Sequence, residues 1–164
     1  MKTYLDLNIK YQGGELDISD NKLVSLDGSP NHITGSFKCD YNNLTSLVGG
    51  PQIVDGSYYC TENNLTDLAG CASHISDTLY CIDNDITSLV GIHKIIKSCK
   101  QIEFDSTKIL VGGIGLLLIA DLDRIANWFE PFDIISKYIG YGTKGMMACR
   151  AELIEKGYSP YAKL

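Results

Sequence analysis

The sequence predicts an α/β repeat solenoid, a parallel β-coil closed by a helical C-terminal cap. Three observations predict this fold class. Four segments align without gaps at a spacing of 21 residues: 16–36, 37–57, 58–78 and 79–99. Each segment opens with apolar residues at alternate positions, which is typical of a short strand with one buried face. After residue 104 the apolar residues follow helical spacing instead. One coil cannot bury its apolar face alone, but stacked coils can.

The first element, residues 1–15, precedes the repeats. Leu5, Leu7 and Ile9 alternate with polar residues. We therefore expect an N-terminal capping strand that covers the open end of the first coil.

The repeats, residues 16–104, share three invariant columns. One column holds asparagine, one leucine and one glycine: Asn21, Asn42, Asn63 and Asn84; Leu26, Leu47, Leu68 and Leu89; Gly28, Gly49, Gly70 and Gly91. Asparagine side chains bond to nearby backbone groups, so we expect a ladder of amides where each coil turns. We also expect Ile33, Val54, Ile75 and Ile96 to return the chain to the core.

Cysteine recurs at the same spacing, at Cys39, Cys60 and Cys81, and Ile18 fills the equivalent position of the first coil. A position that accepts isoleucine favours a buried apolar ladder of reduced thiols over a metal site. The chain has no C-x₂-C spacing of the zinc-binding kind.

The string from Phe37 to Leu44, F-x-C-x-x-N-x-L, resembles the L-x-L-x-x-N-x-L core of leucine-rich repeats. The chain therefore resembles a leucine-rich-repeat-type protein with 21-residue repeats. Ile33-x-x-x-Phe37 is one residue longer than the L-x-x-L of that family. The S-F-x-C-x-x-N-x-L-T-S-L-x-G-x-P cadence and the ending from Cys149 to Leu164 also resemble phage- and prophage-encoded repeat proteins. This resemblance implies a viral origin but no particular activity.

A degenerate fifth coil is expected to end the repeats. Ile102 and Asp105 fall in register with Cys81 and Asn84, but Thr107 stands where leucine is expected. Residues 105–164 are therefore predicted to form the helical cap.

Three helices are predicted in this cap. Leu118, Leu122, Ile125, Ala126 and Phe129 have helical spacing, and Pro131 suits the first turn of a second helix that carries Phe132, Ile135 and Ile139. A third helix, with Met146, Leu153 and Ile154 inward, is expected to stop at Gly157.

The composition excludes several classes of function. The formal charge is −6 and the pI near 4.9, which argues against binding to a nucleic-acid backbone. No basic, apolar leader opens the chain, and the longest apolar stretch, 109–120, is shorter than the ~20 residues of a membrane span. We expect a cytoplasmic protein that makes no membrane contact.

No catalytic residue, metal site or cofactor is expected. Cys149 shares a predicted helix face with Met146 and Leu153, which indicates a core thiol. The histidines are scattered, and Gly112-Gly113-x-Gly115 lacks the lysine of a phosphate loop.

One surface is a candidate binding site. In leucine-rich repeats the outward strand residues line the concave face, and the resemblance carries this role to nine positions here: Lys38, Asp40, Tyr41, Tyr59, Thr61, Glu62, Tyr80, Ile82 and Asp83. Tyr59 and Tyr80 should stand on adjacent strands, and tyrosine is enriched at interface hot spots. The alternative, ordinary stacking between repeats, stays open.

These features favour a non-enzymatic protein-binding module. The resemblance implies that the chain is phage-encoded. Its expected partner is then a host protein, such as a defence component, which it binds through the concave face and inhibits in the host cytosol. A structural, self-assembling homo-oligomer built through the aromatic face or the apolar cap is the alternative. A small enzyme of unrecognised type is the third.

Overall fold

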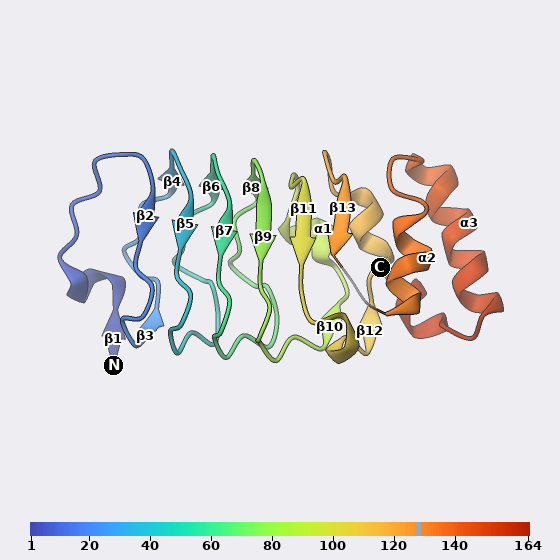
Figure 1. Cartoon of the computed structure of the whole chain (residues 1–164), viewed down its shortest axis with the longest axis horizontal. Helices are drawn as coiled ribbons and strands as arrows, with labels where there is room; N and C mark the ends of the chain where they lie inside the picture. The colour runs from blue at the N-terminus through green and yellow to red at the C-terminus, as the bar shows by residue number, and fades with distance from the viewer. Residues whose placement is uncertain (127–128) are drawn as a thin grey trace.

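The computed structural model describes residues 1–126 and 129–164. Its largest sheet contains six parallel strands in the order β13-β11-β9-β7-β5-β2, lying side by side along the long axis of the molecule (Figure 1). The strands are β2 (Leu16–Asp17), β5 (Phe37–Lys38), β7 (Tyr58–Tyr59), β9 (Thr78–Tyr80), β11 (Gln101–Glu103) and β13 (Arg124–Ala126). Phe37 pairs with Tyr58 and Tyr58 with Leu79, which confirms the predicted parallel neighbours at the 21-residue spacing.

Further strands form smaller parallel sheets. One has three strands in the order β4-β6-β8, and two have two strands each. The bounds are β4 (His32–Ile33), β6 (Ile53–Val54) and β8 (His74–Ile75); β1 (Lys2–Thr3) with β3 (Leu23–Ser25); and β10 (Ser88–Leu89) with β12 (Val111–Gly112). With its few helices, the chain is therefore an α/β protein of parallel strands in stacked sheets.

The core is built from the predicted columns. Cys39 and Cys60 are fully buried, as are Leu44 and Leu65. Gly70 explains the glycine column: its φ is +82°, and a Cβ there would lie 2.2 Å from the backbone nitrogen of Val48 on the preceding coil. The backbones of neighbouring 21-residue segments therefore approach too closely for a side chain at this turn.

The predicted register of the fifth coil is wrong. Ile102 pairs with Leu79 and Glu103 with Tyr80, a spacing of 23 residues, so Ile102 does not align with Cys81. The cause is the short helix α1 (Ile92–Ile95), which lengthens the chain before Ser98 bridges to His74. Ile96 is buried, but it does not continue the column of Ile33, Val54 and Ile75.

The repeating strands also extend past the predicted boundary at residue 105. Ile125 pairs with Ile102, again 23 residues apart, where a helix was expected from Leu118 to Phe129. That prediction is wrong for its described part, because Asp123 and Arg124 donate their backbone N–H groups to the Lys100 carbonyl. Pairing of β13 with β11 satisfies backbone groups at the edge of β11. These groups would have no strand partner if residues 124–126 were helical. Residues 106–108 and 114–118 form the 3-10 helices η2 (Ser106–Lys108) and η3 (Ile114–Leu118).

Two of the predicted cap helices are confirmed. They are α2 (Glu130–Ser136), with a proline in its first turn, and α3 (Gly142–Glu155), followed by the 3-10 helix η4 (Ser159–Ala162). Two details of the prediction are wrong: α2 ends before Ile139, and Ile154 is 53% exposed, because α3 packs inward through Cys149 and Leu153. Phe132 and Ile135 are buried, and the Tyr161 hydroxyl donates to the Ile109 carbonyl at 2.9 Å. Within residues 1–126 and 129–164, no helix is long and apolar enough to cross a bilayer.

The N-terminal capping strand is shorter than predicted. β1 pairs with β3, but residues 4–7 form the 3-10 helix η1 (Tyr4–Leu7). The Asp6 carboxylate accepts the Thr3 backbone N–H at 2.8 Å and fixes this turn. Leu5 and Ile9 are consequently exposed, and Tyr4 is the residue that packs into the core.

Candidate binding face of the six-stranded sheet

An asparagine ladder holds the turns that follow the strands. The Asn63 side chain accepts the Leu44 N–H at 3.0 Å and donates to the Cys39, Cys60 and Thr61 carbonyls at 3.0–3.3 Å. Asn42 and Asn84 repeat this pattern on their own coils. Each amide thus ties its coil to the preceding one, which confirms the predicted ladder and fixes the position of the neighbouring side chains.

Tyr59 and Tyr80 form the centre of the outward column of the sheet. Their strands are direct neighbours, and their rings stack with centroids 4.6 Å apart and planes 7° from parallel. Each ring therefore covers one face of the other. Both side chains are partly exposed. The interstrand stacking expected as the alternative is present.

Lys38 adjoins Tyr59 in this column, and Asp17 lies beyond it on the edge strand β2. The Lys38 ammonium lies 5.9 Å from the centre of the Tyr59 ring and 2.9 Å from the Glu15 carboxylate. The hydrogen bond that Lys38 donates to Glu15 raises the pKa of Lys38. The cation is therefore already paired within the chain, and the column continues beyond Tyr80 to Glu103 and Ala126.

The second column consists of Asp40, Thr61 and Ile82. Asp40 accepts the Thr61 backbone N–H at 2.7 Å, and burial raises the pKa of its carboxyl group. On a later coil Asp105 accepts the Asp83 N–H at 2.9 Å. Asp40 thus supports the backbone between coils, while Thr61 and Ile82 remain half-buried on the surface.

The third column lies in the turn rather than on the strand. Asp20, Tyr41, Glu62 and Asp83 all have a left-handed backbone, with φ of 53°, 53°, 48° and 52°. This conformation is unfavourable for residues other than glycine, asparagine and aspartate. Tyr41 is 55% exposed, and the negative charge of Glu62 raises the pKa of its hydroxyl.

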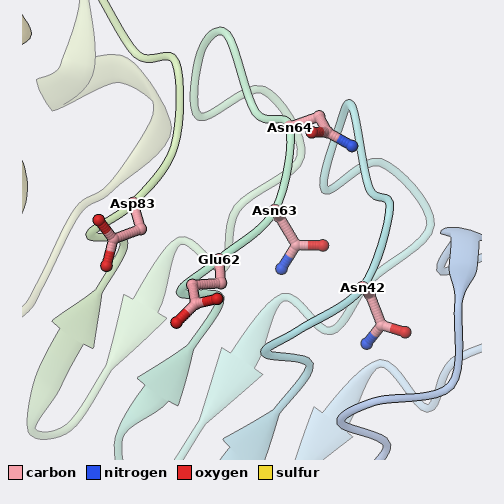
Figure 2. Close-up of a pocket in the computed structure, with 5 residues that line it drawn as sticks. All are labelled: Asn42, Glu62, Asn63, Asn64 and Asp83. Atoms are coloured by element: carbon pink, nitrogen blue, oxygen red, sulfur yellow. The ribbon is translucent and has the colours of Figure 1, made fainter.

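An open polar hollow of about 530 Å³ adjoins this third column and is lined by Asn42, Glu62, Asn63, Asn64 and Asp83. Figure 2 shows the carboxylates of Glu62 and Asp83 on neighbouring turns, pointing the same way. In the described parts of the chain no three His, Cys, Asp or Glu side chains are grouped to hold a metal ion. The hollow therefore presents negative charge to whatever approaches the turn side of the face.

The cysteines are poor nucleophiles. All six are free and buried, which confirms the predicted ladder of reduced thiols. Burial raises the pKa of Cys60 well above its ordinary value and that of Cys149 to about 12. Because the thiolate is the reactive form, neither position favours covalent chemistry at neutral pH.

The structure assembles the nine predicted positions on one side of the molecule but in two roles. Tyr59, Tyr80 and Lys38 form one continuous row, whereas Asp40 acts in the framework. Sequence reasoning missed Glu103 and Glu15, which extend this row or pair with it. Glu103 was missed because its alignment depends on the 23-residue register.

Comparison with protein-family models, with curated proteins and with solved structures gave no match.

Proposed function

We propose that the chain is a leucine-rich-repeat-type solenoid that works as a non-enzymatic protein-binding module through the outward face of its six-stranded sheet. The observation that carries the proposal is the Tyr59–Tyr80 stack, which is partly exposed on neighbouring strands of the sheet. With a phage origin, the partner is a host protein of the cytosol, such as a defence component, that the module inhibits by occupying its surface.

The solenoid part of the proposal is supported by the repetition of one bond. The Leu23, Leu44 and Leu65 backbone N–H groups are each bound by the asparagine of the next coil, at 2.9, 3.0 and 3.0 Å. Equivalent bonds at equal spacing mean that each coil makes the same contact with its neighbour. A stack of this kind is rigid and has an extended surface, which is how repeat proteins bind partners.

The tyrosine stack supports binding because its two side chains are already ordered before a partner arrives. Each ring is held by its neighbour, so a partner that covers the ring edges loses little additional side-chain entropy. Tyrosine edges offer both apolar area and a hydroxyl group for hydrogen bonding. The stack thus has the properties of an interface anchor.

The charge of the face favours a basic partner surface. Glu62, Asp83 and Glu103 border the stack, whereas the nearby Lys38 is already paired with Glu15. Arginine and lysine side chains of a partner would pair with these carboxylates. Charge complementarity of this kind raises association rates and selects partners.

Backbone strain is a second support for a functional role of the turn. Tyr41 and Glu62 occupy a left-handed conformation that Asp20 and Asp83 adopt at lower cost. Unfavourable residues at a repeated position point to a requirement other than stability. Contact of the Tyr41 ring and the Glu62 carboxylate with a partner is such a requirement.

Affinity capture from a bacterial host lysate tests the proposal with three variants. Tyr59→Ala with Tyr80→Ala removes the stack and should abolish capture of the specific partner. Tyr59→Phe with Tyr80→Phe keeps the stack and removes only the hydroxyl groups. Ile53→Ala, on the exposed side of the three-stranded sheet, is the control and should capture as wild type does.

The expected loss is large for the alanine pair, since hot-spot residues typically contribute ~2 kcal/mol or more each. Circular dichroism must show that this pair is folded, because loss of stacking also costs stability. Capture that is unchanged in a folded alanine pair but lost in Ile53→Ala would place the interface on the other side of the molecule.

A further inference from the structure

The outermost helix, α3, exposes an apolar stripe. Met147 is 74% and Ile154 53% exposed, and Ala151 lies exposed beside them. The opposite side of the helix is buried through Gly145, Cys149 and Leu153. Figure 1 shows α2 on the inner side of α3 and no element beyond α3. The stripe is therefore the end face of the molecule.

Two opposite charges flank the stripe, near the two ends of the helix. Lys144 and Glu155 are exposed, and neither takes part in an ion pair among the described residues, whereas Lys137 and Glu152 pair with each other at 2.8 Å. At ~100° per residue, Lys144 and Glu155 lie roughly 20° apart around the helix axis, on one side of the stripe. Met147 and Ile154 lie equally close together on the other side.

A small apolar hollow adjoins the Met147 side of the stripe. Its volume is about 70 Å³, and it is lined by Ile114, Met146, Met147, Arg150, Ala162 and Leu164. The hollow thus lies on the same side of the helix as Ile154, but about two turns toward the N-terminal end.

We propose that a second copy of this chain covers the stripe, so that two α3 helices pack antiparallel about a twofold axis. Such an axis reverses the helix direction and keeps each side of the stripe facing the same side in the other copy. Ile154 of the second copy then arrives level with residues 145–147, beside the hollow. On the opposite side, Lys144 meets Glu155 of the second copy.

Self-complementarity selects a second copy over an unrelated partner. The same surface, inverted, supplies the apolar side chain for the hollow and the opposite charge for each unpaired end. Ala151, between the apolar and the charged side, allows the two helices to approach closely. One helix pair is smaller than the ~1,600 Å² of a standard interface, so the dimer forms in a concentration-dependent manner. Its two six-stranded sheets remain free for the binding face proposed above.

Sedimentation equilibrium of the full chain over a wide concentration range tests the dimer. Wild type should dimerise, and Ile154→Glu should weaken dimerisation more than about tenfold, since it places a charge against the apolar hollow. Leu110→Glu is the matched control, because Leu110 is 66% exposed elsewhere on the surface, and it should dimerise as wild type does.

Charge reversal tests the antiparallel arrangement itself. Lys144→Glu and Glu155→Lys each place two like-charged pairs in the homodimer, so each alone should dimerise about tenfold more weakly. Mixed in equal amounts, the two variants should form a heterodimer in which both pairs are again opposite in charge.

The outcomes are distinct. A wild type that stays monomeric at every concentration overturns the proposal, as does a dimer that Ile154→Glu leaves intact. The antiparallel pairing is overturned if Ile154→Glu weakens the dimer but the mixture of Lys144→Glu and Glu155→Lys does not dimerise more strongly than either variant alone. Circular dichroism on each variant establishes that it is folded.

Discussion

Replacing one asparagine of the ladder should cost more stability than its small side chain suggests. In Asn63→Ala the buried Leu44 N–H loses its acceptor at 3.0 Å. The Cys39 and Cys60 carbonyls keep amide partners on Asn42 and Asn84, so they are not left unsatisfied. One orphaned donor costs ~1–3 kcal/mol, and the lost amide bonds add about 1 kcal/mol. We expect a loss of about 2 to 4 kcal/mol in the free energy of unfolding.

Asn63→Asp should be more damaging than Asn63→Ala at neutral pH. An aspartate oxygen would replace the amide nitrogen that now donates to three carbonyls. Four acceptors would then face one another in a buried site without a donor. Acidification should restore part of the stability of this variant, because a protonated carboxyl group can donate one hydrogen bond.

Urea unfolding followed by circular dichroism measures both effects. Asn64→Asp is the matched control, since Asn64 is exposed and adjacent in the sequence, and it should stay within about 0.5 kcal/mol of wild type. Equal midpoints for Asn63→Ala and wild type, or for the two aspartate variants, would show that the ladder does not hold the coils together.

Four further outcomes are expected. Tyr58→Phe should stabilise the fold by about 1 kcal/mol in urea unfolding, because the buried hydroxyl makes no hydrogen bond to a nitrogen or oxygen atom within residues 1–126 and 129–164, and a loss would contradict this. Tyr161→Phe is its counterpart and should destabilise by a similar amount, since its buried hydroxyl has an acceptor at 2.9 Å. Glu62→Asn should raise stability by about 0.5 to 1 kcal/mol by relieving the left-handed strain, whereas an unchanged midpoint would mean that no strain is stored there. Burial raises the pKa of Cys60, so the neutral thiol contributes fully to the free energy of unfolding below the pKa of an unfolded thiol, ~8.5. This contribution is lost as the pH rises further, by up to ~1.4 kcal/mol per pH unit. Cys60→Val should therefore make the free energy of unfolding less dependent on pH in the alkaline range.

The local repeat was predictable because every coil makes the same contacts. Asn63 and Cys60 recur at a fixed spacing, and a residue that bonds to the neighbouring coil must keep that spacing. The parallel strands, the amide ladder and the buried thiols follow from this periodicity. The outward position of Tyr59 and Tyr80 follows from the alternation of side chains along a strand.

Two features at the ends of the repeats could not be obtained from spacing. The insertion at α1 moves Glu103 rather than Asp105 into the row beside Tyr80. The pattern from Leu118 to Phe129 fits a helix, yet β13 forms because β11 offers unpaired backbone groups. Both features depend on a strand edge contributed by a segment that is distant in the sequence. A local sequence pattern does not indicate such a contact.

The sequence by itself therefore determined the repeat length, the residues that join one coil to the next, and the side of the sheet that carries the candidate site. Only the tertiary structure decided where the coils end, that Asp40 supports the backbone, and that the two tyrosine rings stack face to face. The physical reason is that periodic contacts need the same residue type in every repeat, so they appear as a pattern in the sequence. Register shifts, strained turns and ring orientations instead depend on how each segment packs against the segments next to it.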